Sequence, residues 1–267
     1  MKEKFTHWNV LFIEYLKRDF KKILVWILGL GAFSGGYVPA FVEIGKGQGL
    51  IALYETMRNP AMIAMVGPTP IKEAADYTLG AMYSHMMLLF CSVFAMIIAG
   101  LHIIVHTRKE EENGLTEFVC AYRVGRHANA LALFVELLLI HVVLAIFIGG
   151  MMTAFGAESV TAAPAFLFGA MIGIAGIMGG AMAFLTAQLF PSATGANGAF
   201  LSIVGFLYIL RAGTDISNLD WSMFNPMGWL YLTYPFTENN GRLFGFCLLF
   251  ALVLLCISFL LEGKRDM

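Results

Sequence analysis

The sequence predicts an all-α polytopic membrane protein, and three observations lead to this fold class. Hydrophobic residues make up 59% of the 267 residues, and the mean hydropathy is +0.76. Charged residues make up 13%, about half the share that a soluble domain carries. The apolar residues gather in six long segments, each of at least the roughly 17 residues that a membrane-crossing helix needs. A soluble core cannot bury so much apolar surface behind so little polar surface, so we expect lipid as the solvent.

The first 22 residues predict an amphipathic helix that lies in the membrane interface ahead of the first span. Aromatic and aliphatic residues recur at three- and four-residue spacing from Phe5 to Phe20, accompanied by six lysines and arginines. This combination is typical of an interfacial helix, with a cytosolic helix that packs on a partner as the alternative. The six predicted spans then cover residues 23–42, 79–105, 131–154, 165–190, 194–210 and 243–261.

The distribution of basic residues predicts that both termini are cytoplasmic. With the N-terminus inside, twelve of the 17 lysines and arginines lie on the cytoplasmic side. They comprise six before the first span, four between the second and third, and two after the sixth. Cytoplasmic loops carry an excess of basic residues, which favours this orientation.

The fourth span carries four glycines on one helical face, and Gly31 and Gly35 repeat the pattern in the first span. A smooth face of this kind lets another helix approach closely. One interpretation is ordinary packing within the bundle. The other is a face that slides or separates during a transport cycle. The glycines of the fourth span are Gly169, Gly173, Gly176 and Gly180.

Two segments on the expected outer side, residues 43–78 and 211–241, predict short helices rather than plain loops. The first contains an apolar run broken by three prolines, and the second crowds aromatic rings around Pro226 and Pro235. Rings at this density prefer the membrane interface. Backbone at membrane depth must be buried against the spans. We therefore expect short re-entrant helices, above all between the fifth and sixth spans.

Few titratable residues fall inside the predicted spans. His102 and His106 share a helical face, but no carboxylate or cysteine beside them completes a metal site, and we expect them to snorkel to the interface. Glu136 and His141 lie near the start of the third span, where a charged residue is a functional candidate. A proton relay and a structural polar contact are both open for Glu136. The four cysteines lack metal-site spacing, so we expect neither a metal site nor a catalytic residue.

The segment between the second and third spans, residues 106–128, is densely charged and contains Gly114, which can break a helix. Leu115, Phe118 and Tyr122 follow it at helical spacing. A short amphipathic helix held out into the cytosol by two spans is suited to dock on a partner protein. The composition fits a solvated loop equally well.

Several stretches of the chain resemble the type-2 ABC exporter permeases, in particular the branch of the tetronasin and polyketide-antibiotic exporter permeases. The resemblance covers nearly the whole chain in the same order. Leu115 departs from it, because an arginine is common at that position in the family. The stretches are NPAMIAMVGP (59–68), HTRKEEENGLTE (106–117), VGRHA (124–128), QLFPSATGANG (188–198), RAGTD (211–215) and WSMFNPMGWLYLTYPF (221–236).

The resemblance implies the membrane subunit of an ATP-driven exporter of amphiphilic small molecules, such as antibiotics or lipids, in the bacterial plasma membrane. Residues 1–22 correspond to an elbow helix, and residues 23–267 to a six-span transmembrane domain. The chain binds no cofactor itself, since ATP and Mg belong to a separate ATPase subunit in two copies. The net charge of −1 gives no reason to expect nucleic acid. The coupling residues that the resemblance assigns to the ATPase contact are Arg108, Glu111, Glu112, Gly114, Glu117, Phe118 and Arg126.

The resemblance further implies that short extracellular helices close the outer end of the transport path. Members of this branch usually carry two six-span halves, and this sequence resembles the first. We expect a second half, fused, separate or a second copy, also because six spans leave the glycine faces without an obvious partner. An ion- or proton-coupled secondary transporter is the alternative, but it needs acidic residues deep in the spans, where only Glu136 stands. The residues of the extracellular gate are Arg211, Asp215, Trp221, Pro226 and Trp229.

Overall fold

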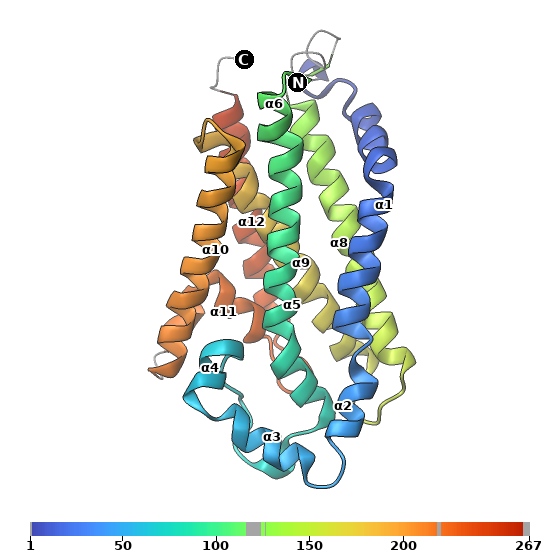
Figure 1. Ribbon diagram of the computed structural model, residues 1–267, viewed down its shortest axis with the longest axis vertical. Coiled ribbons are helices and arrows are strands. Elements are labelled where there is room, and N and C mark those ends of the chain that lie inside the picture. Colours follow the sequence, from blue (N-terminus) through green and yellow to red (C-terminus); the bar gives the residue numbers. More distant parts are fainter. Residues whose placement is uncertain (1, 116–123, 126, 218–219, 264–267) are drawn as a thin grey trace.

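The structure is a computed structural model that describes residues 2–115, 124–125, 127–217 and 220–263, and all regular structure in these residues is helical. Six segments are long and apolar enough to cross a membrane, which confirms the predicted number. Their helices run side by side along the long axis of the molecule (Figure 1). They are α1 (Trp8–Gly35), α5 (Leu79–Ile104), α8 (Ala128–Ala154), α9 (Ala162–Leu189), α10 (Ala193–Ile216) and α12 (Arg242–Glu262).

Short helices connect the long ones at both ends of the bundle. We call the end where α1 begins and α12 ends the terminus end, and the opposite end, with α2, α3 and α4, the loop end (Figure 1). Before α1 lies η1 (Lys2–Phe5), and between α1 and α5 lie α2 (Val38–Ile44), α3 (Gly49–Met57), α4 (Pro60–Val66) and η2 (Ala74–Asp76). A π-helical turn, η3 (Val105–Lys109), and α6 (Glu110–Glu112) extend α5, whereas η4 (Asp220–Phe224) and α11 (Pro226–Tyr231) precede α12.

The N-terminal helix differs from the predicted one. The sequence predicts an interfacial helix that ends at residue 22, yet α1 runs without a break from Trp8 to Gly35. Residues 17–28 contain neither proline nor glycine, so nothing in the local sequence stops the helix there. A new helix begins only at Val38, with a proline in its first turn, where proline is tolerated.

The central helix of the bundle is α9, which contacts α5, α8, α10 and α12 and is buried over most of its length. Its glycine face lies against α8. A Cβ at Gly169 would come within 2.4 Å of the Ala145 carbonyl oxygen, and one at Gly180 within 2.3 Å of the Leu137 side chain. The expectation that this face lacks a partner within the six spans is therefore wrong, because α8 occupies it. Gly35 of α1 also lies against α8.

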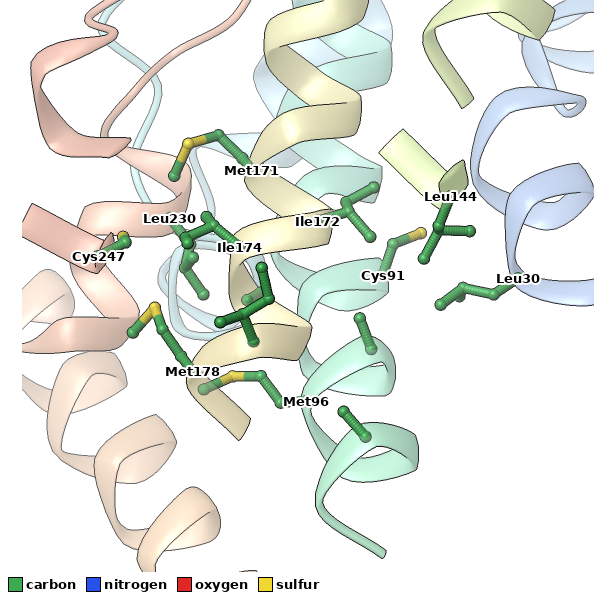
Figure 2. Close-up of a cluster of buried hydrophobic side chains, with 14 of the residues drawn as sticks. Leu30, Cys91, Met96, Leu144, Met171, Ile172, Ile174, Met178, Leu230 and Cys247 are labelled. Atoms are coloured by element: carbon green, nitrogen blue, oxygen red, sulfur yellow. The ribbon is translucent and has the colours of Figure 1, made fainter. Parts of the chain in front are cut away.

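Apolar side chains fill the interior between these helices (Figure 2). Leu30 of α1, Cys91 of α5 and Leu144 of α8 lie near one another on one side of α9. Met178 of α9 and Met96 of α5 pack beside each other below them. In lipid, close packing of this kind holds helices together, because the tails outside are as apolar as the core.

Candidate functional site

The predicted coupling segment lies at the terminus end and is only partly described. Glu117, Phe118 and Arg126 lie outside the described residues. Gly114 has a φ of 73°, the left-handed conformation that favours glycine at the end of a helix. It follows Asn113, the residue that ends α6.

Arg108 and Glu112 make contacts within the chain that the sequence did not predict. Arg108 is buried, and its Nη1 lies 2.8 Å from Glu111 Oε2. Glu112 Oε1 accepts a hydrogen bond of 2.8 Å from the backbone N–H of Ala193, in the first turn of α10. A carboxylate at this position satisfies an unpaired donor and favours the positive end of the helix. The helices α5, η3 and α6 form one continuous run from Leu79 to Glu112, which we call the rod. Glu112 thus connects the end of this rod to the start of α10.

The two histidines of this rod do not snorkel to the interface as expected. His106 is 3% exposed, and the His102 side chain is 11% exposed. His106 lies in the π-helical turn η3, and turns of this type are frequent at functional sites. Both imidazoles point into a polar cluster formed by α1, α5, η3, α6 and α8.

This group, which we call the histidine–carboxylate cluster, comprises Asp19, His102, His106, Glu110 and Glu136. His106 Nε2 lies 3.2 Å from Asp19 Oδ2, and its Nδ1 lies 3.0 Å from Glu110 Oε1. His102 Nε2 lies 3.3 Å from Glu136 Oε2, and the ring centroids of the two histidines are 4.4 Å apart. Asp19 and Glu136 are both fully buried. The cluster places three carboxylates beside two imidazoles inside the bundle.

Sequence reasoning missed Asp19, which it placed on an interfacial helix. A detectable signal was present, because Asp19 stands in register with Tyr15, Ile23 and Trp26, all of which face the bundle. Its distant partner is His106 of η3, more than 80 residues away in the chain. In the described part of the chain, no group of three His, Cys, Asp or Glu side chains could hold a metal ion.

A second polar site lies at the loop end, where Arg211 and Asp215 stand one turn apart on α10. Arg211 Nη1 lies 2.9 Å from Asp215 Oδ2, and both side chains are buried. The other nitrogen of the guanidinium, Nη2, donates to the carbonyl oxygens of Ala64 and Met65 at the end of α4. A cation is favoured there, because helix C-termini carry partial negative charge.

Two short Asn-Pro helices frame this pair. Asn59 caps α4 and Asn225 caps α11, each with a proline at the first helical position. The asparagine oxygen accepts a backbone N–H, and proline there removes a donor that has no partner in any case. From α11, Tyr231 donates a 2.6 Å hydrogen bond to Asp215 Oδ1, which also accepts one from Ser222.

The remaining gate residues from the sequence prediction fall in different surroundings. Pro226 opens α11. Trp229 donates a 2.6 Å hydrogen bond to the Met223 carbonyl oxygen, and its ring packs near two phenylalanines of α12. Trp221 is 66% exposed and lies apart from the buried Arg211–Asp215 ion pair. The structure thus brings together Arg211 and Asp215, joins them to α11, and leaves Trp221 on the surface.

The chain is similar to the multidrug efflux system permease protein Rv1217c of Mycobacterium tuberculosis, with 28% identity over 257 residues. It resembles an efflux permease. The match covers 94% of this chain but 45% of the relative, so the chain spans less than half of that protein's length. No family model matches the chain. The similarity to this permease and the six apolar helices among the described residues together indicate a multi-pass membrane protein.

Proposed function

We propose that this chain is the membrane-spanning permease of an ATP-driven ABC exporter that moves amphiphilic small molecules outward. The observation that carries the proposal is the similarity to a multidrug efflux permease along 94% of the chain. The polar segments between the spans are too short for an ATP-hydrolysing domain. In this proposal, a separate ATPase subunit in two copies supplies the energy, with ATP and Mg bound there.

In this proposal the terminus end is cytoplasmic in a bacterial plasma membrane, and the ATPase subunit docks on residues 106–128. Leu115 offers an apolar side chain that is 46% exposed next to the acidic α6. The rod from Leu79 to Glu112 runs from the loop end to the docking segment. Because Glu112 also bonds to the start of α10, a displacement of residues 106–128 by the ATPase subunit moves both α5 and α10. Rigid helices that shift together are a common means of switching.

The loop end forms the extracellular gate in this proposal. Arg211 and Asp215 connect α10 and α11 with α4, which lies more than 140 residues earlier in the chain. Opening the outer end of the path requires α4 or α11 to leave this pair. Such a move breaks the hydrogen bonds that Arg211 makes to α4 or that Asp215 accepts from α11, so these bonds hold the gate closed until the spans rearrange.

A second six-span half completes the transporter. The chain matches 45% of the length of the related permease, which agrees with one of two similar halves. The glycine faces no longer support this expectation, since α8 fills them within the chain. The second half is fused, separate or a second copy of this chain.

A secondary transporter driven by protons or other ions is the alternative. One observation favours it, because Glu136 is fully buried in α8 with an imidazole as its partner. Titratable groups of this kind inside a membrane mark proton pathways in many transporters. The two proposals differ in whether transport needs ATP.

Purification of the tagged chain in mild detergent, with mass spectrometry of the bound proteins, tests the exporter. We expect an ATPase subunit with wild type and its loss with Glu117→Arg. The matched control is Glu158→Arg, the same charge reversal at an exposed position of the loop end. Glu112 is unsuited to this test, because its replacement also removes a hydrogen bond to the first turn of α10. Absence of any ATP-hydrolysing partner, or equal loss in both variants, contradicts the proposal.

A further inference from the structure

The charge balance of the histidine–carboxylate cluster singles out Glu136. Asp19 is within 2.8 Å of Lys22 and 3.2 Å of Arg18, and Glu110 is within 2.8 Å of Arg18. These two carboxylates are therefore matched by two permanent cations. Among the residues that the structure describes, the ion-pair partner of Glu136 is His102 alone. A buried carboxylate beside a neutral imidazole carries an uncompensated negative charge, whereas one added proton makes the pair neutral.

The pair can be reached from the terminus end. An open cleft of about 590 Å³ lies there, lined by residues that include Tyr15, Arg18 and Glu110. From Glu110, contacts lead to His106 and, ring against ring, to His102 and then Glu136. Carboxylates and imidazoles bind and release protons, and these side chains lead from the cleft towards a fully buried site, with a ring contact in place of a hydrogen bond between the two histidines.

Beyond Glu136 the path ends. Glu136 Oε1, His141 Nε2 and Trp26 Nε1 are buried and have no hydrogen-bond partner among the described residues. The next layer consists of Leu30, Leu144 and Cys91, which pack together in the interior (Figure 2). A path with one open end and apolar packing at the other can load a site with a proton but does not carry protons across.

We propose that Glu136 and His102 form a proton-binding site that is loaded from the terminus end and holds α1 against α5 and α8. A proton from water in the cleft is added to the pair, and the same proton returns to water when the site empties. The Trp26 ring of α1 packs edge-on against His141, at 5.2 Å, and lies 6.0 Å from His102. Loss of the proton leaves a negative charge on the pair whose imidazole lies near this ring, which loosens the packing of α1.

The inference goes beyond the proposed function, because it makes the position of α1 depend on pH whatever drives transport. No titratable side chain comes from α9, where Gly176 abuts His141. The titratable or charged groups that surround the pair are Tyr15, Arg18, Asp19 and Lys22 on α1, His106 on η3, Glu110 on α6, and His141 on α8.

Tryptophan fluorescence of the full chain in lipid nanodiscs tests the site. Phenylalanine replaces Trp8, Trp221 and Trp229, so that Trp26 alone reports. We expect its emission to change in a single step as the pH is raised. Glu136→Gln and His102→Gln should each abolish the step. The matched control, His85→Gln, should retain it, because His85 bonds to Gly67 and Tyr77 at the loop end.

The rate of the Trp26 response after a sudden change of pH distinguishes residues that conduct the proton from residues that bind it. Glu110→Gln should slow the response of Trp26 by about tenfold or more while leaving its final amplitude unchanged. A second measurement, hydrogen–deuterium exchange with all four tryptophans present, should show faster exchange in α1 at alkaline pH after correction for the intrinsic rate. Glu136→Gln should remove this acceleration. An unchanged step in both Glu136→Gln and His102→Gln, or its loss in His85→Gln as well, overturns the proposal.

Discussion

Arg211 and Asp215 form a buried ion pair on one face of α10, with 2.9 Å between Nη1 and Oδ2. Arg211 also binds carbonyl oxygens of α4, which lie 146 and 147 residues earlier in the chain. Desolvation of two charges is costly, and only additional hydrogen bonds make such a pair favourable. Ser222 and Tyr231 provide them on the carboxylate side. The pair therefore fixes the arrangement of the loop end.

Breaking this pair should destabilise the protein strongly. Asp215→Asn leaves the buried guanidinium without a counter-charge, and we expect a loss of about 3–5 kcal/mol in the free energy of unfolding. Equilibrium unfolding in mixed micelles measures it. The double variant Arg211→Leu, Asp215→Leu should lose less than the sum of the two single variants. Additive losses would show that the two groups do not interact.

The tyrosine that binds Asp215 should contribute by a constant amount across physiological pH. Burial, and next the charge of Asp215, raise the pKa of Tyr231 above its ordinary value. A raised pKa means that the contribution is complete below about pH 10, the unfolded value, and is lost only as pH rises through the folded value. We expect Tyr231→Phe to cost about 1–2 kcal/mol, equally at pH 6 and pH 8. A cost that differs between these two pH values would contradict the assignment.

The glycine face of α9 should tolerate no side chain. A Cβ at Gly176 would lie 1.9 Å from His141 Nε2, so Gly176→Ala must displace a buried ring. We expect a loss of about 1–3 kcal/mol, measured as the shift of the unfolding midpoint in detergent. Gly198→Ala is the matched control on α10, where nothing lies within 4 Å, and it should be neutral or stabilising. Equal effects of the two changes would rule out steric contact as the cause.

The Glu112 contact should stabilise the start of α10. Glu112→Gln weakens the charged hydrogen bond to the Ala193 N–H, and we expect a cost of about 0.5–2 kcal/mol. Glu55→Gln on α3, an exposed position, is the control and should change little. Hydrogen exchange at the first turn of α10 should rise in the first variant alone. A protected first turn in Glu112→Gln would show that the carboxylate does not hold this helix end.

Hydropathy was sufficient to predict the six long helices, because lipid requires long apolar segments whatever their neighbours are. It could not predict how α1 continues, because basic residues such as Lys21 and Lys22 fit both a separate interfacial helix and the first turns of a helix that continues into a span. The glycine spacing on α9 correctly indicated a smooth face. It could not identify α8 as the neighbour, because a pattern within one helix contains no information about the other.

For the two polar sites, likewise, the sequence identified some of the residues but not their neighbours from other helices. Arg211 and Asp215 were named from the sequence through the resemblance of the stretch RAGTD to the exporter permeases. Their contact with α4 depends on tertiary structure. His102 and His106 were found as a pair but interpreted as interfacial residues, because Asp19 and Glu136 approach them from other helices. Contacts of this kind are visible only once α1, α5 and α8 are packed.

Transport in inside-out membrane vesicles tests the central claim most directly. An amphiphilic fluorescent dye is offered to vesicles that contain the chain and its ATPase subunit, with and without ATP and with and without a protonophore. The account predicts accumulation that requires ATP and persists when the proton gradient is abolished. Accumulation that needs a proton gradient and proceeds without ATP would contradict it and favour the secondary transporter.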